Sequence, residues 1–340
     1  MTTATTQSAL LDDVQLTAKR IFDLITPELL LVEEEFERQA RSNIQVIAYM
    51  GEYLRRSGGK RVRPALTILS NYAAGGDGSD RSSIRMATVM EFLHTATLVH
   101  DDVIDKAEVR RNRPSINSEF GNQTAVLMGD WLYMSAFETS LAERSLPLLD
   151  ILTAVTRKMT EGELLQLTLL GRTDISEEQY FDVIARKTAH LFSACCEIGA
   201  LLGGADAATQ GRLRDYGMNL GTAFQLVDDL LDFTGTEQSL GKPAGADLIE
   251  GKISLPLIFL LQSHPELRAD VQTVIADQRY DGVPRTRLIE ALEETGALQL
   301  AKQRAVEYAE AARAALDGLT DSPHTRALAT IPTYIVERDR

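Results

Sequence analysis

The sequence predicts an all-α protein, and three features carry this prediction. Apolar residues recur three and four positions apart in the long segments, which is the spacing of one helix face. The alternation of apolar and polar residues that marks a half-buried strand is missing. Glycine-rich stretches such as "RRSGGKRVRP" and "AAGGDGSD" separate the helical segments as turns. We therefore expect a bundle of long helices.

The bundle is expected to be a single domain. The chain has 340 residues, of which 44% are apolar, and this suffices for one large helical core. No linker divides it into two parts. We expect residues 1–8 to be disordered and residues 9–340 to form the domain.

Three segments show the helical pattern clearly. Residues 10–25, "LLDDVQLTAKRIFDLI", and residues 30–42, "LLVEEEFERQARS", carry apolar side chains at helical spacing. Residues 176–204 begin with Ser176 and have Gln179 three positions later, which is the signature of a capping box. This segment ends on two glycines, which favour the end of a helix.

Composition excludes several classes of protein. A net charge of −14 argues against nucleic-acid binding, because phosphate backbones require a basic face. The two cysteines are neighbours, Cys195 and Cys196, so no disulfide framework is expected and a reducing compartment is favoured. The N-terminal residues lack the pattern of a signal peptide, and no apolar run is long enough to span a membrane. We expect a cytoplasmic location.

Two acidic clusters have the same D-D-x-x-D spacing. The first, in "ATLVHDDVIDKAEVRR", consists of Asp101, Asp102 and Asp105, and the second, in "FQLVDDLLDF", consists of Asp228, Asp229 and Asp232. Residues four apart lie on one helix face, so Asp101 pairs with Asp105 and Asp228 pairs with Asp232. Because both clusters lie in apolar sequence, we expect their carboxylates to project from buried helices into a shared central cavity.

Carboxylates in a half-buried cavity repel one another and are costly to desolvate. Divalent cations would offset this cost. Oxygen ligands without a histidine or cysteine cluster favour Mg²⁺ over zinc, and protein-bound Mg²⁺ usually also contacts substrate phosphates. The clusters therefore predict Mg²⁺ and a phosphorylated substrate.

Basic residues near these clusters are the candidates for binding phosphate. Those singled out are Lys60, Arg61, Arg63, Arg110, Arg111, Lys187, Lys242 and Lys252. His94 lies seven residues before Asp101, which places it close to the same helix face. We expect it to lie near the site, where it either binds phosphate or is a satisfied core residue.

The ordered set of motifs resembles the trans-type isoprenyl diphosphate synthases, also called polyprenyl synthetases. It includes "GGKRVRP", "EFLHTATLVHDDVIDKAEVRR", "GNQTAVLMGDWLY", "ARKTAHLFSACCEIGALL", "FQLVDDLLDF", "GKPAGADLIEGKISLPLI" and "VERDR". The resemblance covers nearly the whole chain and implies the isoprenoid synthase fold. It also implies a homodimer, about three Mg²⁺ ions with Mn²⁺ as a substitute, and peripheral membrane contact at most, for product release.

The resemblance assigns roles to individual residues. Asp101 and Asp105, with Asp102 alongside, would hold Mg²⁺ on the allylic diphosphate. Asp228 would hold a further ion, with Asp229 and Asp232 acting partly through water. The allylic diphosphate would be contacted by Arg110, Lys187, Thr188, Gln225 and Lys242. Isopentenyl diphosphate would be bound by Lys60, Arg63, His94 and Arg111.

The implied reaction is the condensation of isopentenyl diphosphate onto an allylic primer, with farnesyl diphosphate favoured. Ala96 and Thr97, just before the first cluster, are small where short-chain members have bulky aromatics. This predicts a long product near C40 for quinone side chains, with Met134 and Phe137 as candidates for the cavity floor. The alternatives are a shorter C20–C25 product, a terpene cyclase or a non-catalytic subunit of a heteromeric synthase.

Overall fold

The computed structural model describes residues 18–44, 47–49, 51, 61–110, 113–235 and 244–338. The described chain is almost entirely helical, as the sequence predicts. Its elements before the second acidic cluster are α1 (Ala18–Asp23), α2 (Thr26–Gln39), α4 (Val62–Ala73), α5 (Arg81–Ile104), β1 (Val109–Arg110), β2 (Arg113–Pro114), α6 (Ile116–Phe120), α7 (Asn122–Leu141), α8 (Leu146–Leu169), α9 (Glu177–Ile184), the π-helix η1 (Ala185–Ala189) and α10 (His190–Leu202). The remaining elements are α11 (Ala207–Thr234), α13 (Ala246–Ile249), α14 (Leu255–Ser263), the 3₁₀-helix η2 (Pro265–Leu267), α15 (Arg268–Asp277), α16 (Arg285–Glu294), α17 (Ala297–Ala315) and α18 (Pro323–Glu337).

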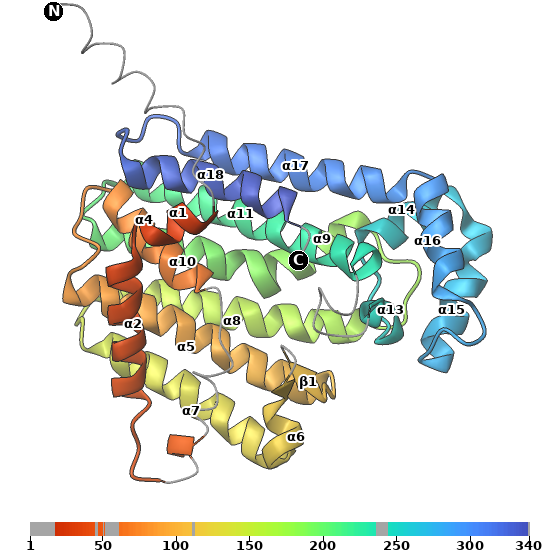
Figure 1. Ribbon diagram of the computed structural model, residues 1–340, viewed down its shortest axis with the longest axis horizontal. Coiled ribbons are helices and arrows are strands. Elements are labelled where there is room, and N and C mark those ends of the chain that lie inside the picture. The colour runs from red at the N-terminus through yellow and green to blue at the C-terminus, as the bar shows by residue number, and fades with distance from the viewer. Residues whose placement is uncertain are drawn as a thin grey trace, which may run out of the picture.

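The long helices run roughly along one axis of the molecule (Figure 1). Helix α2 crosses them at one end, and α15 and α16 stand across them at the other. Within the bundle, α11 packs against α10, α17 and α18, while α10 packs against α4, α5 and α8. The two strands form an antiparallel ribbon that pairs Val109 with Pro114. Helices α10 and α11 therefore form the middle of the bundle.

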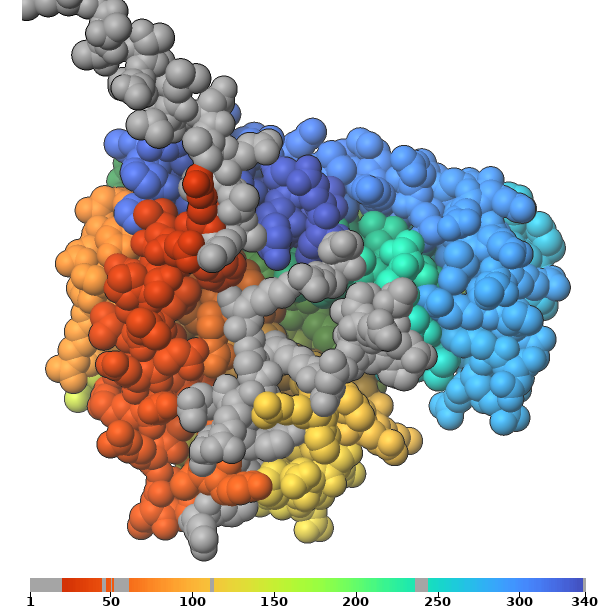
Figure 2. Space-filling model, in the orientation of Figure 1, coloured from red at the N-terminus to blue at the C-terminus, as the bar shows by residue number. Residues whose placement is uncertain are grey.

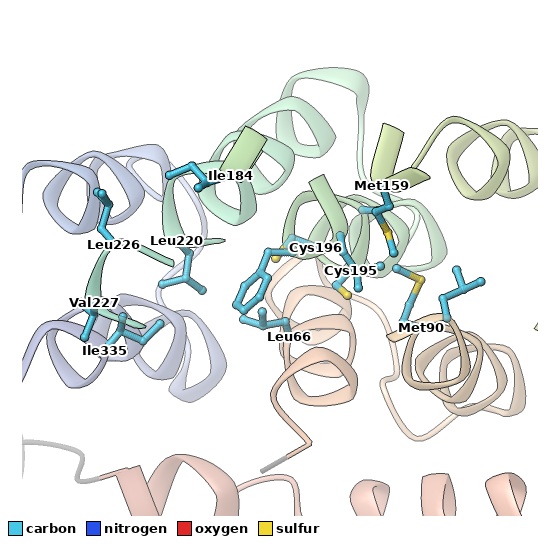
Figure 3. Close-up of a cluster of buried hydrophobic side chains, with 14 of the residues drawn as sticks. Leu66, Met90, Met159, Ile184, Cys195, Cys196, Leu220, Leu226, Val227 and Ile335 are labelled. Atoms are coloured by element: carbon cyan, nitrogen blue, oxygen red, sulfur yellow. The ribbon is translucent and has the colours of Figure 1, made fainter. Parts of the chain in front are cut away.

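One contiguous apolar core extends from Ile21 to Ile335. Figure 3 shows side chains from α4, α5, α8, α10 and α11 meeting there, with Cys195 and Cys196 among them. Burial raises the pKa of the Cys195 thiol to about 12, so this thiol stays protonated and packs as a small apolar side chain. The expected single domain remains a prediction, and residues 1–8 lie outside the described part.

Close helix crossings in the middle of the bundle depend on glycine. A Cβ at Gly199 of α10 would lie 2.3 Å from the carbonyl oxygen of Thr67 on α4. A Cβ at Gly217 of α11 would lie 2.5 Å from the carbonyl oxygen of Phe192 on α10. Neither position has space for a side chain. These two glycines let α4, α10 and α11 approach closely enough to exclude water.

The segment predicted as one helix from Ser176 is continuous but changes its winding along its length. The capping box is present, because the Ser176 hydroxyl accepts from the Gln179 N–H and the Gln179 side chain accepts from the Ser176 N–H. The helix then widens to a π-helix at residues 185–189. Opposite this turn lies Gly162 of α8, where a Cβ would be 2.7 Å from the Cβ of Arg186. The π-turn was not predicted, and it lies where α8 packs most closely.

The face seen in Figure 2 is indented between α15 and the β1–α6 region. No helix among the described residues is long and apolar enough to cross a membrane.

The expected helix at residues 10–25 is described only from residue 18, as α1, and the helix predicted at 30–42 begins earlier, at Thr26. Pro27 in its first turn explains that start, since proline is well suited to a helix N-terminus.

Candidate active site

A cavity of about 300 Å³ lies between the C-terminal ends of α5 and α8, the π-helix, α11 and the segment that follows α13. Apolar side chains from α8, α9 and α5 form part of its wall, among them Leu98, Leu169 and Val183. Its ionisable lining consists of Asp101, Asp105, Arg110, Tyr180, Lys187, Asp229, Asp247 and Lys252. The cavity thus combines acids, cations and an apolar wall in one space.

The first acidic cluster ends α5. Asp105 follows the last helical residue, and its N–H donates to the carbonyl oxygen of Asp101 at 2.8 Å, so the two aspartates keep helical spacing. Burial raises the pKa of Asp101 to about 6, although the positive charge of Lys187 opposes this rise. Asp105 accepts from Nζ of Lys252 at 3.0 Å. Both predicted ligands on α5 therefore face the cavity.

The π-helix brings Lys187 and Thr188 to the cavity wall. Nζ of Lys187 lies 2.6 Å from Oε2 of Glu163 on α8. The hydroxyl of Thr188 donates to Oε1 of Gln225 on α11 at 2.7 Å. Single π-turns often occur at functional sites. Three of the residues predicted to contact the allylic diphosphate are therefore neighbours in the structure.

The member of the second acidic cluster that enters this cavity is Asp229, not the predicted metal pair of Asp228 and Asp232. Asp229 lines the cavity, where its Oδ1 accepts from Nε2 of Gln225 at 2.8 Å and its Oδ2 accepts from the hydroxyl of Tyr180 at 2.5 Å. Burial and the negative charge of Asp247 raise the pKa of the Asp229 carboxyl above its usual range. On α11, the pair of residues four positions apart that lines the cavity is thus Gln225 and Asp229.

Asp228 and Asp232 do not line this cavity. Asp228 forms an ion pair with Arg338, which follows α18, and the guanidinium of Arg338 also lies 4.1 Å from the ring centroid of Phe224. Asp232 is 1% exposed and its Oδ2 accepts from the N–H of Asp247 at 3.3 Å. Successive helical residues point about 100° apart, which explains why Asp229 faces the cavity and Asp228 faces α18.

Asp102 lies behind the cavity wall. It is 3% exposed, and its Oδ1 accepts from Nε of Arg110 at 2.6 Å. Arg110 itself lines the cavity from strand β1. This ion pair joins the end of α5 to the β ribbon and sets where Arg110 stands.

Arg63 and His94 do not line the cavity. The guanidinium of Arg63, in the first turn of α4, lies 5.0 Å from the ring centroid of Phe192. His94 is half-buried on α5. Lys60 and Arg111, the other two residues predicted to bind isopentenyl diphosphate, lie outside the described residues. Lys242, predicted to bind the allylic diphosphate, also lies outside them.

The chain-length candidates differ in burial. Ala96 is fully buried on α5, and Thr97 is half-buried beside it. Phe137 of α7 is partly buried and packs against the core. Met134, by contrast, is 62% exposed. The expectation that Met134 forms a cavity floor is wrong for the single chain, because its side chain lies on the outer face of α7.

The segment after the second cluster is anchored where the structure describes it. The N–H of Gly245 donates to the carbonyl oxygen of Asp232 at 2.9 Å, and the hydroxyl of Tyr280 donates to the carbonyl oxygen of Gly245, also at 2.9 Å. A φ of 77° at Gly245 favours glycine there. Lys252 then reaches Asp105 and lies 2.6 Å from Glu250. This segment is therefore tied to α11 from Gly245 onward.

Glu163, Tyr180 and Asp247 were not identified from the sequence. Glu163 and Tyr180 occupy ordinary positions in amphipathic helices, and no spacing marks them. Asp247 stands in the quoted motif "GADLIEGK", and this was the one signal that could have revealed it.

Comparison with known proteins decides the family. The family model for polyprenyl synthetases matches residues 44–291. The chain belongs to the polyprenyl synthetase family. It is therefore a prenyltransferase of the trans-polyprenyl diphosphate synthase class, as its motifs predict.

Individual relatives of this synthase match over most of their length. Octaprenyl diphosphate synthase of Escherichia coli (strain K12) is 38% identical over 323 residues, which cover 95% of this chain and 99% of the relative. Geranylgeranyl diphosphate synthase of Methanosarcina mazei is 36% identical and covers 84% and 88% of the two chains. The crystal structure of a polyprenyl synthase from Caulobacter crescentus CB15, complexed with calcium and isoprenyl diphosphate, superposes with a TM-score of 0.91. It is 35% identical, and the match covers 96% and 99% of the chains.

Proposed function

We propose that this synthase condenses isopentenyl diphosphate onto an allylic diphosphate primer, with farnesyl diphosphate as the primer and a product near C40. The observation that carries the proposal is the cavity in which Asp101, Asp105 and Asp229 stand beside Arg110, Lys187 and Lys252. Acids suit divalent cations, and cations suit a diphosphate. An apolar wall beside both suits a prenyl chain.

The donor set fits Mg²⁺. Asp101 and Asp105 offer carboxylate oxygens, and a nearby cation would favour the ionised form of Asp101, which burial disfavours. Among the described residues, no three acidic, histidine or cysteine side chains are grouped to hold an ion by themselves. Mg²⁺ usually takes one or two carboxylates and completes its shell with phosphates and water. We expect Mg²⁺ to bind together with the diphosphate on these two aspartates, and Asp228 would become a further ligand only when its ion pair with Arg338 opens.

The residues of the chain then act on the leaving group. Bound Mg²⁺ neutralises charge on the diphosphate. Lys187 and Arg110 stabilise the negative charge that develops as the allylic C–O bond breaks to give diphosphate and a carbocation. The double bond of isopentenyl diphosphate attacks the carbocation, and the released diphosphate takes the proton that the product loses. Leu98, Leu169 and Val183 exclude water, which would otherwise quench the carbocation.

Product length near C40 is supported by the small residues Ala96 and Thr97 and by the octaprenyl relative. The geranylgeranyl relative, with nearly the same identity, keeps a C20 product as the alternative. We further propose a homodimer. Helix α7 carries apolar side chains on its outer face, including Leu127 at 68% exposure and Met134, and a second subunit would cover them.

The test is incubation with Mg²⁺, farnesyl diphosphate and isopentenyl diphosphate. Diphosphate release that needs both substrates, with a long product on chromatography, is the expected result. Release from the allylic substrate alone would indicate a cyclase, and no release would indicate a non-catalytic subunit.

The carboxylate pair of Asp101 and Asp105 allows a test of the proposed Mg²⁺ site by mutation. Asp101→Ala should lower turnover by about a hundredfold or more, because the leaving diphosphate loses its charge stabilisation. Folding should be retained, since removing a desolvated carboxylate relieves repulsion. Circular dichroism and steady-state rates check both points. Near-normal turnover of Asp101→Ala would refute the shared-metal assignment.

A further inference from the structure

Arg61 joins three helices at the start of α4. Its Nη1 donates to Oε1 of Glu91 on α5 at 2.6 Å, and its Nη2 donates to Oε2 of Glu33 on α2 at 3.1 Å. The side chains of Arg61 and Glu91 are 14% and 6% exposed. Two carboxylates from different helices are thus held by one guanidinium that is largely withdrawn from water.

Aromatic packing fixes the same guanidinium from a third direction. Its central carbon lies 5.9 Å from the ring centroid of Phe36, one turn after Glu33 on α2. The Phe36 ring stacks on Phe92 of α5, with centroids 4.4 Å apart. A planar guanidinium can bind two carboxylates and lie over a ring at once, whereas a lysine ammonium cannot provide that planar fork.

The backbone at Arg61 is held in an unfavourable conformation. Its φ is 47°, in the left-handed region that side-chain-bearing residues rarely adopt. Such conformations persist only where the surroundings determine them, and they are common at functional sites. Here the surroundings are the two carboxylates and the ring, so these contacts fix the direction in which the chain enters α4.

The two helices joined in this way carry the residues assigned to isopentenyl diphosphate. Arg63 is two residues after Arg61, in the first turn of α4. His94 is three residues after Glu91, one turn further along α5. A shift of α4 against α5 would therefore change the separation of Arg63 and His94.

We propose that Arg61 is a positioning residue that, by binding Glu33 and Glu91, holds Arg63 and His94 at the spacing that isopentenyl diphosphate requires. The inference rests on the proposed function, in which those two residues bind that substrate. Arg61 itself faces the carboxylates of the protein and touches no substrate. Its removal should weaken the binding of one substrate only.

The test compares Arg61→Gln with a matched control on α5, the helix that carries Glu91. Arg61→Gln should raise KM for isopentenyl diphosphate by about tenfold, because small misplacements of binding groups are costly. Its kcat and its KM for farnesyl diphosphate should stay near wild type. The control is Arg85→Gln, which removes the ion pair of Arg85 with Glu143, whose side chains are 11% and 8% exposed. It should lower thermal stability comparably and leave both KM values unchanged.

A double-variant cycle separates positioning from direct contact. If Arg61 acts through Arg63, Arg61→Gln should add little to KM in an Arg63→Gln background. Equal changes in both KM values, or full additivity, would overturn the proposal. Glu33→Gln is the milder variant if Arg61→Gln does not fold, since that carboxylate is 33% exposed, and it should raise the same KM less. A wild-type chain that condenses nothing would instead refute the proposed function.

Discussion

Two lysines at the cavity of this synthase are each paired with an acid from another element. Lys187 of the π-helix pairs with Glu163 of α8, and Lys252 pairs with Asp105 of α5. Burial opposes a charge on Lys252, but Asp105 and Glu250 outweigh it and raise its pKa. The Lys252 pair thus compensates the charge of Asp105, one of the carboxylates of the cavity. We expect a divalent cation with its diphosphate to take over part of that role.

Product length is a residue-scale prediction. Thr97→Phe should shorten the product towards C20 while condensation continues, because a ring on this half-buried side would obstruct the growing chain and leave Asp101 untouched. Ala96→Phe should also shorten the product, with a further loss of about 1–3 kcal/mol in stability, since Ala96 is fully buried and a ring there would have to displace its neighbours. Chromatography of the products measures the first effect and urea unfolding the second.

Phe137 and Met134, both on α7, provide a test variant and a control for product length. Phe137→Ala should lengthen the product if its ring limits the chain, while Met134→Ala should leave the length unchanged, because that side chain points outward from α7 and away from the core. An unchanged product from Thr97→Phe would show that the chain grows along another path.

His190 gives the enzyme an acid-sensitive contact outside the cavity. Burial, followed by the charges of Lys158 and Arg186, lowers its pKa to about 4 from 6.5, while Asp182 opposes the shift. A lowered pKa in the folded state means that the stabilising effect is complete above the unfolded pKa and is lost as pH falls towards 4. His190→Gln should reduce the acid loss of unfolding free energy by about 1 kcal/mol, because the group is only half-buried. Urea unfolding of both proteins near neutral pH and in mild acid measures this difference. If both lose the same unfolding free energy in acid, another group and not His190 causes the loss.

At the scale of helices, α11 offers a comparison between two glycines. Gly217→Ala should lower the free energy of unfolding by about 2 kcal/mol, because its Cβ would meet the backbone of Phe192. Gly211→Ala should be neutral or stabilising by up to about 1 kcal/mol, since its nearest neighbour is the mobile end of Arg214 at 3.7 Å. Urea unfolding of both variants tests the close crossing, and similar stabilities would contradict it.

Local patterns in the sequence predicted the elements well. The capping box at Ser176 and the helical spacing of Asp101 and Asp105 depend on neighbouring residues, and both occur in the structure. The π-turn was missed because one extra residue leaves an apolar pattern that still suits a helix. Met134 was misplaced because α7 is apolar on its outer side too, so periodicity could not distinguish core from surface.

The site was less predictable where it depends on distant parts of the chain. At the cavity, Asp229 accepts a hydrogen bond from Tyr180, which comes from another helix. The pairing of Asp228 with Arg338 joins residues 110 positions apart, and no local pattern reports such a contact. Burial and long-range pairing decide which aspartate of a D-D-x-x-D motif faces the cavity and which one pairs with another part of the chain.

At the scale of the whole molecule, the end of the chain returns to the second acidic cluster. The ion pair of Arg338 with Asp228 competes with any cation for the same carboxylate. Arg338→Gln should therefore lower, severalfold, the Mg²⁺ concentration that gives half-maximal activity. Arg326→Gln, which removes an exposed ion pair between α18 and Asp321, should leave that Mg²⁺ concentration unchanged. A raised Mg²⁺ requirement in Arg338→Gln would mean that Arg338 supports metal binding instead.

The π-turn between α9 and α10 also fixes a rotation. One extra residue turns everything beyond it by about 100° around the helix axis. Tyr180 can thus face Asp229 while Gly199, further along the same continuous rod, faces the backbone of α4. The number of residues in the π-turn, and not any one side chain, therefore sets the rotational phase of the cavity-facing end relative to the core-facing end. No point substitution can reset this phase, whereas deleting a single residue within 185–189 would turn one end of the rod away from its partner.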